Sequence, residues 1–213
     1  LGPDRPAITY ALRGIAYYEL LLTGPARDLH SGMFGGAVTN PANTLARLLG
    51  AMVDAEGRIQ LPGFYDDVLE LTAEERRRFG EIGFDERAFM ERIGVTGLSG
   101  EAGYTTLERR WARPTFDVNG LWGGYQGEGS KTVLPARAGA KLSFRLVPDQ
   151  RPEQISRALR TFVAERALPG IDWELVEHNM APAVLVPLES AFLSAAARSV
   201  EAVFGTPPVF IRE

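Results

Sequence analysis

Hydrophobic and polar positions alternate most regularly over residues 141–147. The apolar side chains Leu142, Phe144 and Leu146 are separated there by polar side chains. A period of two places every second side chain on the same face, so this segment predicts a strand with one buried face. Residues 171–177 alternate in the same way and predict a second such strand.

Shorter apolar segments predict further strands. Residues 8–23 are rich in Ile, Tyr and Leu, and Gly14 divides them into two strand candidates. Residues 115–119 and 132–135 also have β character. The chain ends on the strand-like apolar run 209–213, without a following turn. This ending suggests a piece of a longer protein, and a natural C-terminal edge strand is the alternative.

Helical spacing of apolar residues predicts three longer helices. Asn40-Pro41 combines a capping residue with proline at the first helical position, which predicts a helix over residues 41–55. A second helix begins at Pro152, and a third, amphipathic helix spans residues 187–204. The apolar stripes of the first two helices are Leu45, Leu48, Leu49, Met52 and Val53, and Ile155, Leu159, Phe162 and Val163.

Residues 58–110 resemble an insertion, because short charged segments alternate there with Gly and Pro. The segments 65–71, 73–79 and 85–93 have helical character. The order of strands and helices outside this insertion predicts an α+β fold. We expect a ferredoxin-like, two-layer sandwich, in which an antiparallel sheet of about four strands is covered by two helices.

Composition and charge exclude several classes of protein. The 213 residues are 45% hydrophobic and 23% charged, and a net charge of −4 is spread without a basic block, which disfavours nucleic acid as a partner. No apolar run reaches membrane-spanning length, and the N-terminus has no secretory pattern. The absence of cysteine excludes disulfides and thiolate zinc sites. We expect a soluble, cytoplasmic protein.

One of the two histidines lies in a glycine-rich loop just before a helix start. The loop reads Asp28-Leu29-His30-Ser31-Gly32-Met33-Phe34-Gly35-Gly36. Glycine permits tight turns and close approach of a ligand, and an imidazole near neutral pH can donate, accept or bind metal. A solvated or hydrogen-bonded loop histidine is the alternative. The chain has no His-x-Asp, His-x-x-x-His or Gly-x-Ser-x-Gly pattern, so neither a metal site nor a Ser-His-Asp hydrolase is indicated within it.

Two other features have both a functional and an ordinary interpretation. Residues 120–135 are rich in glycine, but they lack the spacing and the following helix of a phosphate loop. They form either a loop that meets a small anion or a long hairpin connection. Arg145 lies on the polar face of the strand at 141–147, where it is either solvated or a two-pronged clamp for a carboxylate.

Together these segments resemble the lid, or dimerisation, domain of the dinuclear-zinc peptidases of the carnosinase, carboxypeptidase G and aminoacylase family. The resemblance spans the whole chain and is strongest to the carnosinase-like dipeptidase branch. In chain order, the matching motifs are Asp28 to Gly36, Asn40-Pro41, Trp111-Ala112-Arg113-Pro114-Thr115, Asp117-Val118-Asn119-Gly120, Gly127-Glu128-Gly129-Ser130-Lys131-Thr132-Val133-Leu134-Pro135 and Ser143-Phe144-Arg145-Leu146-Val147-Pro148-Asp149.

The resemblance implies a role for four residues. His30 would reach the active site of a second subunit and stabilise the oxyanion of the tetrahedral intermediate. Thr132 would hydrogen-bond the substrate, and Arg145 would hold its carboxylate. His178, in a weaker match to a His-x-x-x-Pro pattern, would also contact the substrate.

The resemblance also implies how the whole protein is organised. Residues 1–184 would form the lid domain, and residues 185–213 would belong to the catalytic domain, which carries two zinc or other divalent ions. No metal would be bound by this chain, which alone would be inactive. The expected partners are a second copy of the chain and a peptide or N-acyl amino acid substrate. The alternative is a dimerisation module of a non-catalytic, regulatory homologue.

Overall fold

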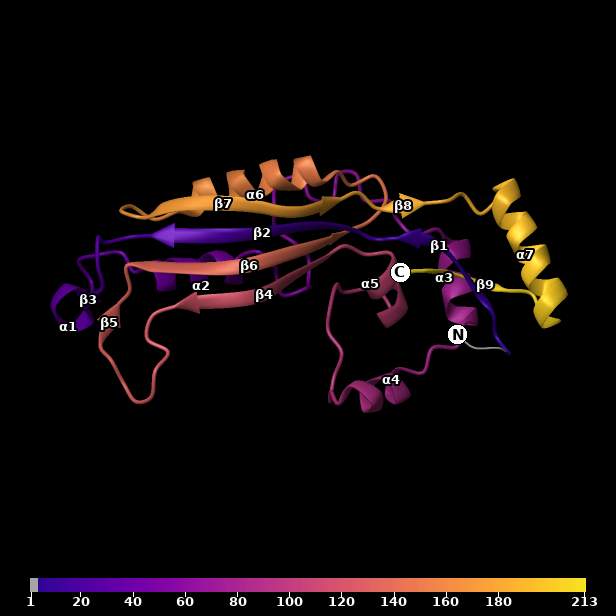
Figure 1. Ribbon diagram of the computed structural model, residues 1–213, viewed down its shortest axis with the longest axis horizontal. Helices are drawn as coiled ribbons and strands as arrows, with labels where there is room; N and C mark the ends of the chain where they lie inside the picture. The colour runs from indigo at the N-terminus through magenta and orange to yellow at the C-terminus, as the bar shows by residue number, and fades with distance from the viewer. Residues whose placement is uncertain (1–3) are drawn as a thin grey trace.

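The computed structural model describes residues 4–213. The molecule is elongated (Figure 1), with the short strand β3 (Leu29–His30) and helix α1 (Ser31–Phe34) at one end and helix α7 (Ala191–Phe204) at the other. Two larger sheets lie between these ends. Over the described residues, no helix combines the length and apolar character needed to cross a membrane.

Four antiparallel strands form the central sheet, in the order β4-β6-β2-β7. They are β4 (Thr115–Gly123), β6 (Arg137–Leu146), β2 (Gly14–Thr23) and β7 (Asp172–Ala181). Strand β2 pairs with β6 over its whole length without a register shift, from Gly14 opposite Leu146 to Thr23 opposite Arg137. The predicted antiparallel sheet of four strands is confirmed.

Helices α2 (Pro41–Gly50) and α6 (Pro152–Arg166) cover one face of this sheet. The even-numbered side chains of β2 and β6, such as Leu20, Leu142 and Phe144, are fully buried against them and form the main core. Burial of this alternating set fixes the register, because a slip by one residue would expose it. The odd-numbered side chains form the opposite face, which no helix of the described chain covers.

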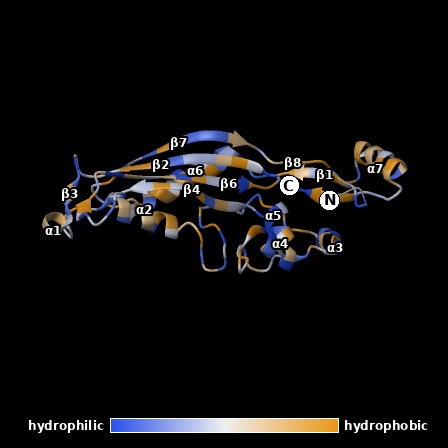
Figure 2. Cartoon of the chain, turned by 60° about the horizontal axis from the view of Figure 1, so that its bottom comes forward, coloured by the Kyte–Doolittle hydropathy of each residue, from blue (hydrophilic) through white to orange (hydrophobic). Residues whose placement is uncertain are grey.

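A second sheet joins the two ends of the described chain. Strand β1 (Ala7–Leu12) lies between β8 (Val184–Leu185), to which it is antiparallel, and β9 (Val209–Arg212), to which it is parallel. The segments on either side of Gly14 therefore belong to different sheets. Helix α7 leaves Phe192 87% exposed and Val203 78% exposed, and apolar residues are visible along it in Figure 2.

The inserted segment contains three short helices, α3 (Ala73–Glu81), α4 (Glu86–Ile93) and α5 (Thr106–Trp111). Helices α3 and α5 pack with β9 in a second core, which includes Phe79 and Ile211. The insertion is therefore anchored to the second sheet.

The helix predicted at 65–71 is wrong, because the turn at residues 62–67 is followed by residues without regular secondary structure. The reason is tertiary: the Tyr65 hydroxyl accepts a hydrogen bond from the Ile59 amide, and the carbonyl of buried Phe64 accepts one from Gln150. Helix α5 was not predicted, although Thr105 and Glu108 form a reciprocal capping box at its start. Helix α2 ends at Gly50, short of the predicted 55.

A buried ion pair ties the insertion to the central sheet. The Arg113 side chain, 1% exposed, donates from Nε and Nη2 to the two carboxylate oxygens of Glu101 at 2.7 and 2.8 Å. Arg58 donates to the same carboxylate at 2.8 Å. Since Arg113 lies just before β4, this pair positions the edge strand against the insertion.

Removing Arg113 should therefore be costly. We expect Arg113→Leu to lower the free energy of unfolding by about 3 kcal/mol, because Glu101 is left buried with one weaker partner. Arg87→Leu is a matched control, since its ion pair with Glu91 is exposed and should change stability little. Urea denaturation measures both variants, and equal midpoints would contradict a structural role for the buried pair.

Candidate functional site

His30 and Thr132 lie side by side at the end of the molecule formed by α1. Strand β3 pairs with β5 (Val133–Leu134), which brings Thr132 next to His30. The Thr132 Oγ1 atom is 3.0 Å from His30 Nε2, and the Ser31 amide donates to the Thr132 carbonyl at 3.0 Å. Two of the residues singled out in the sequence are thus adjacent, although 102 positions separate them.

The loop backbone determines which nitrogen of His30 carries the proton. The Gly32 amide donates to Nδ1 at 3.1 Å. A ring nitrogen that accepts a hydrogen bond carries no proton, so the neutral ring is protonated at Nε2, which donates to Thr132 Oγ1. A Cβ atom at Gly32 would lie 2.9 Å from His30 Cε1, so a side chain at this position would displace the ring. The loop therefore presents one exposed N–H donor.

Arg145 lies near the opposite end of β6, on the uncovered face of the central sheet. Its register partners are Ile15 of β2 and Thr115 of the edge strand β4. The side chain is exposed and forms no ion pair with any described residue of the chain. The guanidinium is therefore available to an external anion.

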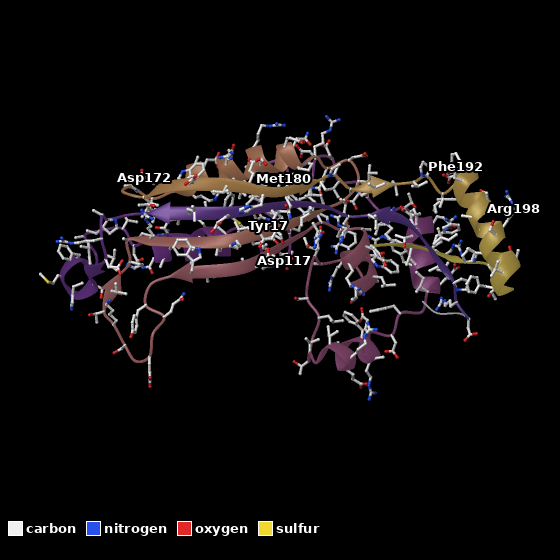
Figure 3. The ribbon with its side chains drawn as sticks, viewed as in Figure 1. Tyr17, Asp117, Asp172, Met180, Phe192 and Arg198 are labelled. Atoms are coloured by element: carbon white, nitrogen blue, oxygen red, sulfur yellow. The ribbon has the colours of Figure 1, made fainter. Side chains whose placement is uncertain are left out.

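His178 lies on the same uncovered face, beside Tyr17 and Glu19. Its Nε2 is 3.5 Å from Glu19 Oε2, and its ring meets that of Tyr17 edge-on at 5.9 Å. Figure 3 shows Tyr17 near the middle of β2. Strand β7 shifts register at this point, which leaves His178 in an irregular stretch of the pairing. Glu19 therefore gives His178 a partner within its own sheet.

The four residues thus form two separate groups. Thr23, the last residue of β2, pairs with Arg137 at the end of the sheet from which the His30 loop continues. Arg145 lies eight residues further along β6, which at about 3.3 Å per residue is a separation of roughly 26 Å. His30 and Arg145 of one chain cannot contact the same dipeptide-sized ligand.

No metal centre is formed by the part of the chain that the structure describes. Residues 4–213 contain no group of three His, Asp or Glu side chains placed to hold a metal ion. Among the candidate residues, His30 and Thr132 can donate hydrogen bonds and Arg145 can neutralise charge.

The chain is thus an α+β domain with two groups of candidate residues. His30 and Thr132 lie at one end of the central sheet, and Arg145 and His178 lie toward the other end. Residues 10–171 match the family model described as peptidase dimerisation domain. The chain belongs to this family.

Curated relatives of the chain include dipeptidases. The chain is 33% identical to the Cys-Gly metallodipeptidase of Saccharomyces cerevisiae and 32% identical to the Beta-Ala-His dipeptidase of Homo sapiens. Both alignments cover 100% of this chain. They cover 45% of the Saccharomyces cerevisiae protein and 43% of the human protein. The chain therefore spans less than half the length of these relatives. They support the assignment to the carnosinase-like dipeptidase branch.

Solved structures give the same assignment. The structure of a metallo-carboxypeptidase from Sulfolobus solfataricus superposes with a TM-score of 0.85 at 35% identity, over 98% of this chain and 47% of that one. Human carnosine dipeptidase 1 superposes with a TM-score of 0.78 at 31% identity, over 100% of this chain and 46% of that one. The fold is thus that of the peptidase dimerisation domain.

Two arginines near Arg145 were not singled out in the sequence. Arg13 lies between β1 and β2, and Arg110 lies in α5; both line the same cavity as Arg145. Nothing in their local sequence distinguishes them from other arginines of the chain. Only the fold brings them together.

The proton position on His30 can be measured directly. We expect nitrogen NMR of the neutral ring to show Nε2 protonated and Nδ1 unprotonated, because Gly32 donates to Nδ1. Gly32→Ala should displace the ring and shift its signals. Gly50→Ala is the matched control, since a Cβ there meets nothing within 4 Å. A proton on Nδ1 in the unaltered protein would contradict the assignment.

Proposed function

We propose that this chain is the lid and dimerisation domain of a metal-dependent dipeptidase, which cleaves dipeptides or related amides that carry a free carboxylate. The observation that supports this most directly is that a hydrogen-bond donor and a cation lie near opposite ends of the central sheet. The Nε2–H donor of His30 lies at one end of the sheet and Arg145 lies near the other. Relatives of the chain include a metallodipeptidase and a second dipeptidase, each about twice its length.

His30 is proposed to stabilise the oxyanion of the tetrahedral intermediate. As the scissile carbonyl is attacked, its oxygen becomes negative, and a fixed N–H donor then binds it more strongly than it binds the substrate. Nε2–H is already oriented by the Gly32 amide. The oxyanion would replace the Thr132 hydroxyl as acceptor, and this hydroxyl could then hydrogen-bond the substrate.

Arg145 is proposed to bind the substrate carboxylate. A guanidinium can place two parallel N–H bonds on a carboxylate, which fixes the position of the substrate as well as its charge. His178, on the same face, would contact the substrate from the neighbouring strand while Glu19 holds its ring. These contacts orient the scissile bond relative to the catalytic unit.

The two groups are proposed to meet in a dimer. Because roughly 26 Å separates the His30 end of β6 from Arg145, one site needs His30 and Thr132 from one chain and Arg145 from its partner. The His30 loop also carries Met33, 75% exposed, which is apolar surface that a second chain would bury. The partner in this proposal is a second copy of the chain.

We also propose that the chain contains parts of two units. The expected boundary between residues 184 and 185 falls within β8, and β1 pairs with β8 and β9 rather than with β2, so all of β8 and β1 would belong to the second unit. The central sheet and its helices form the lid. The second sheet, with α7, would continue into the catalytic unit, which is proposed to hold the two divalent ions.

Mixing two inactive variants of the full-length protein tests whether His30 acts in trans. One variant carries His30→Ala, and the other lacks only its metal site. In random mixed dimers one of two sites regains every group, so we expect about a quarter of the wild-type activity. No recovery would contradict the proposal.

A parallel mixture provides the control. Arg145→Ala replaces His30→Ala, and no activity should return, because Arg145 is proposed to serve the metal site of its own chain. Recovery in both mixtures would show that Arg145 also acts in trans.

Arg145→Lys tests the two-pronged carboxylate contact. We expect KM for a dipeptide to rise by about tenfold or more, since a single ammonium cannot donate two parallel bonds. Arg157→Lys is the matched control, because Arg157 is exposed on α6, away from the uncovered face. Steady-state kinetics measure both, and an unchanged KM for Arg145→Lys would identify Arg145 as a solvated surface residue.

A further inference from the structure

Three arginines lie close together near the junction of β1 and β2. Arg13, Arg110 and Arg145 line one cavity of about 660 Å³, at the end of the sheet opposite the His30 loop. Cavities of this volume accommodate small organic ligands. The three come from different elements, namely the β1–β2 junction, helix α5 and strand β6.

Arg13 has a buried donor without an acceptor. Its Nε atom is shielded from solvent and forms no hydrogen bond with any of residues 4–213. Burial, together with the neighbouring charges of Arg145 and Arg110, lowers the pKa of the Arg13 guanidinium. A buried donor without a partner is costly, as is a cluster of like charges, and an anion would relieve both costs.

The carboxylates in the cavity wall do not neutralise this cluster. Glu101 is already bound by Arg58 and Arg113, at 2.7 to 2.8 Å. Asp54 accepts hydrogen bonds from the amides of residues 56 and 58 and from the Gln60 side chain.

Asp117, the remaining carboxylate, lies on β4 (Figure 3) and lines the same cavity. It accepts a hydrogen bond from the Thr115 hydroxyl at 3.3 Å. Arg13, Arg110 and Arg145, together with Arg109, whose Nε donates to the Glu101 carbonyl at 2.9 Å, therefore outnumber this carboxylate. The cluster has charge enough for a ligand with two negative groups.

We propose that Arg13 and Arg110 form a second carboxylate subsite beside Arg145, so that the enzyme favours dipeptides with an acidic C-terminal residue. The α-carboxylate would bind Arg145, and the side-chain carboxylate would bind Arg13 and Arg110. Arg145 pairs with Ile15, and Arg13 precedes Ile15 by two residues, which at about 3.3 Å per residue is roughly 7 Å along β2 from the position opposite Arg145. Long arginine side chains can span that distance to the two carboxylates of one residue. This subsite rests on the proposed role of Arg145.

The test compares two dipeptides that differ only in charge, Ala-Glu and Ala-Gln, with the full-length enzyme. We expect kcat/KM for Ala-Glu to exceed that for Ala-Gln by about tenfold or more, because a charge-assisted hydrogen bond is lost with the amide. Arg110→Gln and Arg13→Gln should each lower this ratio several-fold. Arg157→Gln, on an exposed face of α6, is the matched control and should leave the ratio unchanged.

The possible outcomes separate the subsite from the proposed function. If both dipeptides are cleaved at equal rates, or if neither variant changes the ratio, the subsite is overturned while the dipeptidase proposal stands. A carboxylate elsewhere in the full-length protein that already pairs with Arg13 would give the first of these results. If neither dipeptide is cleaved, both proposals fail. Arg110 is exposed, so its variant retains the test even if Arg13→Gln does not fold.

Discussion

The length and straightness of the β2–β6 pair constrain every other part of this domain. The two strands are paired without a shift from Gly14 to Thr23, and α2 and α6 bury one complete face of them. A strand packed in this way cannot bend its two ends together, because bending would break ladder hydrogen bonds and expose the core. The end of β6 beside the His30 loop is thus held roughly 26 Å from Arg145, near the other end of the strand.

Because of this separation, His30 cannot share a dipeptide-sized ligand with Arg145 of its own chain. Among residues 4–213, the hydrogen-bond partners of the His30 ring are the Gly32 amide and the Thr132 hydroxyl. Both partners orient the ring, and the amide fixes its neutral tautomer. In the proposed function, this preoriented donor would complete a site formed by another copy of the chain.

The central sheet was largely predictable, because its signals are local. Alternation at Leu142, Phe144 and Leu146 indicated β6, and Asn40-Pro41 located the start of α2. The failures have tertiary causes or involve short elements. The turn at residues 62–67 is held by a hydrogen bond from distant Gln150 to the Phe64 carbonyl, and α5 is a single short helix whose start the capping box marks.

The candidate site was predictable only in part. The glycines around His30 indicated a special loop, but its contact with Thr132 depends on the β3–β5 pairing between distant segments. The clustering of Arg13 and Arg110 with Arg145 depends on the packing of α5 beside the β1–β2 junction, so single-residue reasoning could not find it. Which carboxylates lie near these arginines is set by the folded cavity and not by their sequence neighbours.

The most direct test is a crystal structure of the full-length protein with a phosphinate analogue of a dipeptide, whose tetrahedral phosphorus mimics the intermediate. We predict that His30 Nε2 of one chain lies within hydrogen-bond distance of a phosphinate oxygen. Arg145 of the other chain should bind the carboxylate of the same ligand. His30 and Arg145 of a single chain on one ligand, or a ligand that His30 does not approach, would contradict it.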